Sequence, residues 1–335
     1  MGQGAGLAPC SLRTNKEKRL SGFHLFFATD IHGSETCFRK FLNAGLAYKA
    51  EVLIMGGDMT GKMLIPLVAQ AGGRYSFEWL GSAHTLPEAE LPDYEKQMRL
   101  SGCYPYRTTP EEKAALETDP ARLKQLFAEV MRTTVAQWLD LAEQRLAGTG
   151  IECFITPGND DVLEVDEAFR ASPSVHNPEG TVSVIKGEYE MIACGYSNRT
   201  PWNSPREMEE EALQSYLQAM AKRLKDPSRA IFNFHCPPFD SGLDTAPKID
   251  RTLKPVTGLT GVEMTAVGSA AVARVIREYQ PLLGLHGHVH ESRAAIKLGR
   301  TLCVNPGSEY SEGILRGCLL WLDRGRVRDY MLTSG

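Results

Sequence analysis

The sequence has no apolar run long enough to cross a bilayer, and no apolar segment of signal-peptide length opens it. It also lacks an excess of basic residues, because 37 lysines and arginines stand against 41 acidic residues, a net charge of -4. This balance gives no general attraction to nucleic acid or to anionic lipid. We therefore expect no membrane partner and see no strong signal for nucleic-acid binding, and any phosphate group would have to be bound at a local site.

The eight cysteines show no CxxC pair and no regular spacing. A chain of 335 residues with an apolar fraction of 42% can build a hydrophobic core without disulfides. This cysteine usage is typical of a reducing compartment and predicts a cytoplasmic protein. The polar segment 1–20 is expected to be a disordered tail, and 21–335 is expected to form the folded domain.

Two dense apolar runs, 23–29 and 51–57, are separated by a helical pattern at 35–50. A strand, a short helix and a second strand in this order predict a β-α-β unit, in which the two strands lie parallel. The sequence therefore predicts an α/β fold, with the carboxyl ends of both strands at the same edge of one sheet.

Further strands and helices follow along the chain. A capping box at Ser204 to Glu207 predicts the start of a helix. Prolines favour irregular structure at 86–110, and glycines with prolines favour a loop at 237–262. The other expected elements are a hairpin at 62–80, helices at 120–147, 204–225 and 268–279, strands at 151–156, 230–235, 281–286 and 301–308, a strand pair at 181–197 and a hairpin at 314–332.

Side chains that commonly bind metals follow the ends of five predicted strands. Residues two apart in an extended segment point the same way, so DIH at 30–32 and HVH at 288–290 each aim two side chains at one spot. In open α/β sheets the carboxyl ends of the strands share one crevice, where ligands bind. We therefore expect seven metal ligands to converge: Asp30, His32, Asp58, Asn159, His235, His288 and His290.

Each of these residues also has an explanation that needs no metal. Asp30 or Asp58 could cap a helix or complete a turn, and His235 could be a hydrogen-bonded core histidine. The stretch PGNDD at 157–161 is, alone, typical of a surface turn. The segment HGHVH at 286–290 is harder to explain in this way, because it holds three of the eight histidines. The complete set in this order favours a metal site.

The donor types indicate which ions would bind. Carboxylate, carboxamide and imidazole groups without a thiolate cluster suit Mn, Fe, Co or Zn better than Mg or Ca. Seven donors are too many for one ion, but two divalent transition-metal ions can share them if one carboxylate bridges. Such a centre activates water and stabilises in-line displacement at phosphorus. The sequence therefore predicts metal-dependent hydrolysis of a small phosphoester.

The order of the motifs resembles a known family. DIH (30–32), GGD (56–58), GND (158–160), His235 and GHVH (287–290) are similar to the five motifs of the calcineurin-like metallophosphoesterases. The most similar branch comprises predicted prokaryotic phosphoesterases related to cyclic-AMP phosphodiesterases. The resemblance implies an α/β fold of four layers, α-β-β-α, in which two mixed sheets lie between helices.

The resemblance also implies how the ligands divide between two metal ions, for which Mn is favoured. A hydroxide bridging the two ions would attack phosphorus in line. The first ion would take Asp30, His32 and His290, the second would take Asn159, His235 and His288, and both would share Asp58.

Asp160 departs from the family pattern, in which a histidine commonly follows the motif asparagine. Three roles are open for it: a general acid, a support for neighbouring groups, or a surface acid. Asp161 matches an acidic position of relatives, and its task is open too. Members without the histidine are often phosphodiesterases, so the resemblance favours a phosphodiester substrate, with a nucleotide-like one as an option. The alternatives are a phosphomonoesterase or protein phosphatase, and a non-catalytic interaction scaffold on the same fold.

The chain between Asp58 and Asn159 is far longer than one crossover between parallel strands needs. If the helix at 120–147 is the crossover, a partly helical insertion remains at about 62–118. Its aromatic side chains either wall the substrate pocket or form a small core of their own. These aromatic residues are Tyr75, Phe77, Trp79, Tyr104 and Tyr106.

The loop NRTPWN at 198–203 is a candidate for substrate binding. Arg199 could bind a phosphate through its planar guanidinium, and Trp202 could stack on a base. An ordinary surface loop is the alternative. The segment Asn305 to Ser308 follows a strand near the same edge and is expected to be structural. No pattern indicates an oligomeric state.

Overall fold

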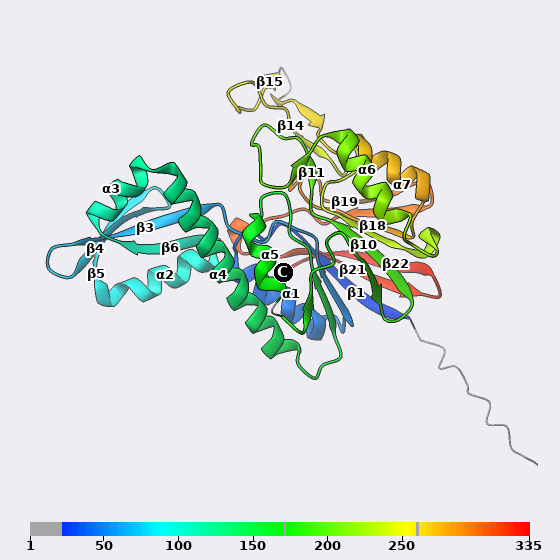
Figure 1. The fold of residues 1–335 in the computed structure, drawn as a ribbon, viewed down its shortest axis with the longest axis horizontal. Helices are drawn as coiled ribbons and strands as arrows, with labels where there is room; N and C mark the ends of the chain where they lie inside the picture. Colours follow the sequence, from blue (N-terminus) through cyan, green and yellow to red (C-terminus); the bar gives the residue numbers. More distant parts are fainter. Residues whose placement is uncertain (1–21, 171, 259–260) are drawn as a thin grey trace, which may run out of the picture.

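The computed structural model describes residues 22–170, 172–258 and 261–335. Two six-stranded sheets lie face to face, and helices cover their outer faces (Figure 1). The predicted α/β fold of four layers is therefore confirmed. The tail predicted at 1–20 lies outside the described residues, and the division of the chain into domains stays a prediction.

The first sheet contains the predicted β-α-β unit. Strands β1, β2, β7 and β8 are parallel, and β21 and β22 continue the sheet beyond β1 in antiparallel pairing. The strand order is β22-β21-β1-β2-β7-β8. The bounds are β1 Phe23–Ala28, β2 Val52–Met55, β7 Glu152–Ile155, β8 Val175–His176, β21 Arg316–Asp323 and β22 Arg326–Ser334.

The second sheet has a parallel centre and antiparallel edges. Strands β10, β13, β18 and β20 are parallel, and β9 and β19 pair antiparallel at the two sides. The order is β19-β20-β18-β13-β10-β9. The bounds are β9 Val182–Ile185, β10 Tyr189–Cys194, β13 Ile231–Phe234, β18 Leu283–Leu285, β19 Ala294–Leu298 and β20 Thr301–Asn305. In both sheets the loops that carry the predicted ligands follow parallel strands.

Alternation of apolar side chains along β1 shows how the layers are held together. Phe23, Leu25 and Phe27 point into the core between the two sheets, where they meet side chains of the second sheet. Phe26 and Ala28 point to the other face, into the core under the helices. Because both faces of β1 are buried, the strand is apolar except at the partly buried His24, as expected for the centre of a layered α/β fold.

Helices cover each sheet on one side only. α1, α4 and α5 pack on the first sheet, and α6 and α7 pack on the second. The side chains of Ser34, Asp119 and Ser269 cap α1, α4 and α7 by accepting a hydrogen bond from a backbone N–H of the first turn. The bounds are α1 Glu35–Ala47, α4 Pro120–Leu146, α5 Asp166–Arg170, α6 Glu210–Ala221 and α7 Ala270–Tyr279.

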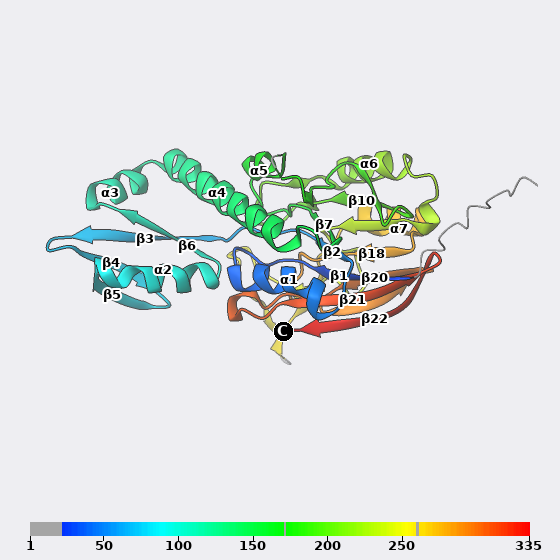
Figure 2. The ribbon, with the colours of Figure 1, turned by 90° about the horizontal axis from the view of Figure 1, so that it is seen from below.

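A third sheet projects from the body of the molecule, and the long helix α4 leads back from it, as Figure 2 shows. Its strand order is β5-β4-β3-β6. The irregular structure predicted at 86–110 is wrong, because α2 and β6 lie there. Pro92 stands in the first turn of α2 and Pro105 in the edge strand β6, where each is tolerated. The bounds are β3 Met63–Gln70, β4 Arg74–Trp79, β5 Ser82–Pro87, α2 Leu91–Leu100, β6 Cys103–Thr108 and α3 Pro110–Thr118.

The aromatic residues of this region mainly build a small core. Phe77 is buried there together with aliphatic side chains of β3 and α2, and Tyr75 and Trp79 pack against the same cluster. Tyr104 instead joins the core on the helical side of the first sheet, and its hydroxyl accepts a hydrogen bond from the Gly61 N–H at 2.8 Å. Of the two alternatives for Tyr75, Phe77 and Trp79, the structure therefore shows the small core.

The helix predicted to begin at Ser204 starts later, so this boundary is wrong. α6 begins at Glu210, and Glu207 lies in the short strand β12 (Glu207–Met208), which pairs with β11 (Ser197–Asn198). Glu207 does accept a hydrogen bond from the Ser204 N–H at 2.9 Å, as in a capping box. The Ser204 hydroxyl, however, donates to Asp160 at 2.8 Å, so the second half of the box is not made.

The segment predicted as a loop at 237–262 contains short strands. β14 (Thr245–Pro247) pairs with β17 (Met264–Ala266), and β15 (Thr257–Gly258) pairs with β16 (Gly261–Val262). The prediction of a loop is wrong for these strands, which are too short to produce a strand pattern in the sequence.

The described part of the chain bears on membrane-spanning helices and on disulfides. No helix in it is long and apolar enough to cross a membrane. Its seven cysteines are all free, and six of them are buried, as scattered cysteines of an α/β core would be.

Candidate metal centre

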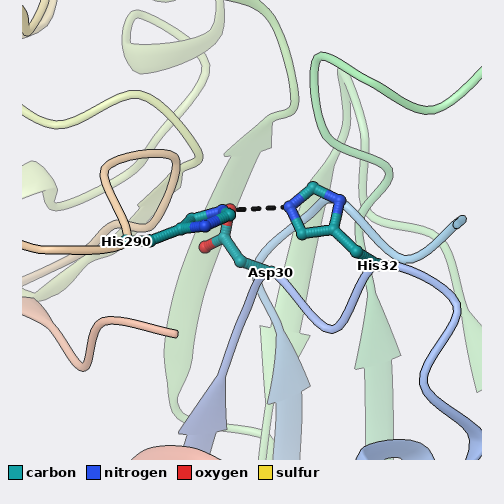
Figure 3. Close-up of side chains that lie close together, drawn as sticks. All are labelled: Asp30, His32 and His290. Atoms are coloured by element: carbon teal, nitrogen blue, oxygen red, sulfur yellow. Dashed lines mark hydrogen bonds and ion pairs between the residues drawn. The ribbon is translucent and has the colours of Figure 1, made fainter. Parts of the chain in front are cut away.

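Three of the predicted ligands form a first cluster at the carboxyl end of β1. Asp30 and His32 lie in the loop after β1, and His290 lies in the loop after β18 (Figure 3). Nε2 of His32 is 3.0 Å from Nε2 of His290, which is in turn 3.4 Å from Oδ1 of Asp30. Two sheets therefore contribute to one cluster.

A second cluster is centred on Asn159, in the loop after β7. Its Oδ1 lies 3.0 Å from Nε2 of His235 and 2.7 Å from Nδ1 of His288. His235 follows β13 and His288 follows β18, so three strand ends meet here. The PGNDD stretch does form a bend, but the bend carries Asn159 inward, where only 3% of the residue is exposed.

Asp58 lies between the two clusters. Its Oδ2 is 3.7 Å from Nε2 of His32, in the first cluster, and 3.4 Å from Nε2 of His235, in the second. Donor atoms of Asp58, His235 and His288 also lie within 4.8 Å of one another. One carboxylate thus reaches both groups, as a bridging ligand would.

The chemistry of the donor set fits divalent metal ions. Carboxylate oxygens, an amide oxygen and imidazole nitrogens converge, and two ring nitrogens, of His32 and His290, face each other at 3.0 Å. Asp30 and Asp58 are 1% and 2% exposed. Buried carboxylates are costly without a cation, and facing lone pairs need a proton or a metal between them. The residues present could therefore hold metal ions.

The backbone at this centre adopts a rare conformation at four donor positions. The φ angles are 54° at Asp30, 38° at His32, 50° at Asp58 and 66° at His288. Left-handed backbone at residues other than glycine costs about 1–3 kcal/mol each and concentrates at functional sites. Four such positions at one centre indicate that the loops are shaped for the direction of their side chains.

Two motif glycines are required by close packing behind the ligands. A Cβ at Gly158 would lie 2.2 Å from Oδ1 of Asp58, and one at Gly287 would lie 2.3 Å from Oδ2 of Asp30. Both distances are far below van der Waals contact, so any side chain would displace a candidate ligand. This explains why glycine precedes Asn159 and His288.

Burial and the acidic neighbours set the protonation of the histidines. Burial lowers the pKa of His32 and of His288 to about 4, which leaves both rings neutral and able to bind metal at neutral pH. Burial also acts to lower the pKa of His235, but the charges of Asp58 and Asp30 outweigh it and raise the pKa to about 10. A metal ion must therefore displace a proton from His235.

Asp161 connects the loop after β2 with the loop after β7. Its Oδ1 accepts hydrogen bonds from the backbone N–H and the hydroxyl of Thr60, at 2.8 and 2.7 Å. Its Oδ2 accepts from the N–H groups of Met59 and Gly158, at 3.1 and 2.7 Å. The carboxylate thus joins the loops that carry Asp58 and Asn159, which answers the question that the sequence left open about its task.

Asp160 is held by three neighbours. Its Oδ2 lies 2.6 Å from Nζ of Lys62, and its Oδ1 accepts from the Ser204 hydroxyl at 2.8 Å and the Asn159 amide at 2.9 Å. Burial acts to raise the pKa of Asp160, but the charge of Lys62 and its hydrogen bond outweigh burial and lower the pKa. Among the three roles left open, this position favours a support for neighbouring groups.

Sequence reasoning missed Lys62 and Tyr310. Lys62 lies four residues after Asp58 in the chain. The ring of Tyr310 lies 4.7 Å from that of His32 and 6.0 Å from that of His290. In the sequence, Lys62 is near the GGD motif, and Tyr310 lies two residues after the segment Asn305 to Ser308. The direction of a side chain cannot be read from such closeness.

The remaining predicted residues lie on two segments that contact residues of the centre. Arg199 and Trp202 are in the loop between β11 and β12, the loop that brings Ser204 to Asp160; Arg199 pairs with Glu209 at 2.9 Å, and Trp202 is exposed. Their binding roles stay predictions. Ser308 is structural, as expected: its hydroxyl donates to the backbone oxygen of Asp30 at 2.6 Å.

Comparison with known proteins bears on the fold more than on the activity. No protein-family model matches the chain. An uncharacterised protein of Methanocaldococcus jannaschii, MJ1162, is 28% identical over 158 residues, which make up 47% of this chain and 64% of that protein. The match thus spans less than two thirds of that relative.

Solved structures of similar fold cover nearly the whole chain. TT1561 of Thermus thermophilus has a TM-score of 0.51 and 16% identity, over 94% of this chain and 99% of that one. This likeness supports the two-sheet architecture alone. An archaeal phosphodiesterase has a TM-score of 0.36 and 10% identity, over 93% of this chain and 99% of that one.

Proposed function

We propose that this chain, which resembles the calcineurin-like metallophosphoesterases in its fold and in the order of its motifs, is a metal-dependent phosphoesterase. The finer proposal is that it hydrolyses a phosphodiester, with a nucleotide-like substrate as an option. The observation that carries the proposal is the pair of donor clusters that share Asp58.

The seven side chains would divide between two ions as the family resemblance implies, with Mn favoured. When bound, two divalent ions would activate a water for in-line attack at phosphorus and neutralise the charge of the phosphate. The protein orients these donors through buried loops: Thr29 donates to Oδ2 of Asp30 at 2.7 Å, and the backbone oxygen of Gly56 contacts Nδ1 of His235 at 2.9 Å. Such contacts fix the direction of the donor atoms.

The preference for a phosphodiester rests on Asp160. No histidine stands at this position to protonate a leaving oxygen, and both oxygens of the Asp160 carboxyl are already hydrogen-bonded. Members of the family that the chain resembles are often phosphodiesterases when they lack this histidine, and a leaving oxygen that is weakly basic or bound to metal needs less help from an acid. Substrate contacts by Arg199 and Trp202 remain further proposals, as does a cytoplasmic location. The lowered pKa of Asp160 argues against the general acid role that the sequence left open.

The test compares generic substrates under one set of conditions. With Mn added, bis-p-nitrophenyl phosphate should be hydrolysed faster than p-nitrophenyl phosphate. Asp58→Ala and His288→Ala should abolish both reactions, while His176→Ala, at an exposed histidine of β8, should retain them. A strong preference for the monoester would favour a phosphomonoesterase or protein phosphatase instead. Hydrolysis that survives in Asp58→Ala would refute the proposed centre, and no hydrolysis by the wild type would favour a scaffold.

A further inference from the structure

Lys62 occupies a fixed position at the edge of the metal centre. It follows the loop after β2, just before β3, and its Nζ lies 2.6 Å from Oδ2 of Asp160. Asp160 is itself held, because its Oδ1 accepts from Ser204 and from the Asn159 amide. The ammonium group is therefore anchored through a carboxylate that has little freedom to move.

This anchored charge stands beside the candidate ligands. The Asp160 N–H donates to Oδ1 of Asp58 at 2.9 Å, and an oxygen of the Asp160 carboxylate lies within 4.8 Å of donor atoms of both His32 and Asp58. The side chain of Lys62 is nevertheless 49% exposed. An anion that approaches the centre from solvent can therefore reach the ammonium group.

The charges explain why a lysine is needed at this point. The Asp160 carboxylate, alone, would repel a phosphate group at the place where relatives have a histidine. Lys62 cancels that charge. An ammonium group has three N–H donors, and the bond to Asp160 uses one of them. The other two N–H groups can therefore donate to oxygens of a substrate.

We propose that Lys62 binds a non-bridging oxygen of the substrate's phosphoryl group and that Asp160 positions it. The proposal rests on the phosphoesterase function proposed above and refines it: Lys62 and Asp160 together replace the histidine that follows the motif asparagine in relatives. Lys62 is accordingly a binding residue, and Asp160 is a positioning residue.

The experiment uses the full chain loaded with Mn and titrates it with inorganic phosphate by calorimetry. Lys62→Met should weaken phosphate binding about tenfold, the effect of one lost charge-assisted hydrogen bond of about 1.4 kcal/mol. Lys62→Arg should keep most of the affinity. Lys113→Met is the matched control, because Lys113 has a similarly exposed side chain, 45%, and also pairs with a carboxylate, that of Glu117. It should bind phosphate like the wild type.

Kinetics and metal content complete the test. In Lys62→Met the KM for bis-p-nitrophenyl phosphate should rise about tenfold with a smaller change in kcat, as expected for lost substrate binding. Its metal content should equal that of the wild type. Unchanged phosphate affinity in Lys62→Met, or loss of metal from it, would overturn the proposal. If the wild type hydrolyses no phosphoester, the proposed function fails, whereas the phosphate titration still decides the role of Lys62.

Discussion

Replacing Asp161 by asparagine should destabilise the protein through the loops that hold the metal centre. Asp161 is fully buried and accepts four hydrogen bonds, two on each carboxylate oxygen. An asparagine can accept on one side only. The fewest hydrogen bonds are lost if the NH2 group of the asparagine faces Thr60, because the Thr60 hydroxyl can turn and accept. The Thr60 N–H is then left without an acceptor.

The expected loss follows from these contacts. One buried N–H without a partner costs about 1–3 kcal/mol, and the bonds that remain weaken because they no longer end on a charge. The free energy of unfolding should therefore fall by about 2–5 kcal/mol in Asp161→Asn. Affinity for Mn should fall as well, because the hydrogen bonds that join the loops of Asp58 and Asn159 are weaker without the charge.

Urea unfolding in the presence of a chelator measures the first effect without any contribution from metal. The midpoint should shift to lower urea at an unchanged slope. Glu129→Gln is the control: Glu129 is an exposed partner of Arg132 on α4, so its replacement should leave the midpoint close to that of the wild type. If Asp161→Asn unfolds at the same midpoint as Glu129→Gln, the structural role assigned to Asp161 is wrong.

Three further predictions concern the same centre. Gly287→Ala places a Cβ 2.3 Å from Oδ2 of Asp30 and should weaken Mn binding by about 10- to 100-fold in a metal titration; wild-type affinity would contradict the packing argument. The His235 proton, with a pKa raised to about 10 from 6.5, stabilises the metal-free protein fully below pH 6.5, and this stability is lost as the pH rises through about 10. Metal competes with that proton, so Mn affinity should rise about tenfold per pH unit between pH 7 and 9. Calorimetry in buffers of different ionisation enthalpy should show that a proton is released on binding. An Mn affinity that does not change with pH would contradict the raised pKa of His235. Phe77→Ala should cost about 3–5 kcal/mol within the small core of the third sheet while leaving metal content unchanged, and metal loss would show that this core supports the centre.

The layered fold could be predicted because its strands are nearly continuous apolar runs. β1 is buried on both faces, so it has a strong signal in the sequence, and Asp30 lies two residues after its end. The rule that parallel strands end at one edge then places the candidate ligands together without knowledge of any side-chain contact.

The wrong predictions of secondary structure each have a local cause. The stretch around Pro92 and Pro105 has the composition of a loop, yet both prolines stand where a helix or an edge strand accepts them. Ser204 and Glu207 have the spacing of a capping box, but the Ser204 hydroxyl donates to Asp160 instead of taking part in a helix cap, and no helix begins there.

Lys62 shows what sequence patterns cannot supply. It lies 98 positions before Asp160 in the chain, and nothing in the spacing joins the two residues. Their contact depends on the packing of the loop after β2 against the loop after β7, which Asp161 holds together. Such pairs follow from tertiary structure, not from propensity or period.

The central claim is that two divalent ions share one centre through Asp58. Elemental analysis of full-length protein, purified without chelator and supplied with Mn, tests it most directly. Wild-type protein should hold about two transition-metal ions per chain, and Asp58→Ala should hold fewer. A wild type that retains no metal, or an Asp58→Ala variant that retains as much as the wild type, would contradict the account.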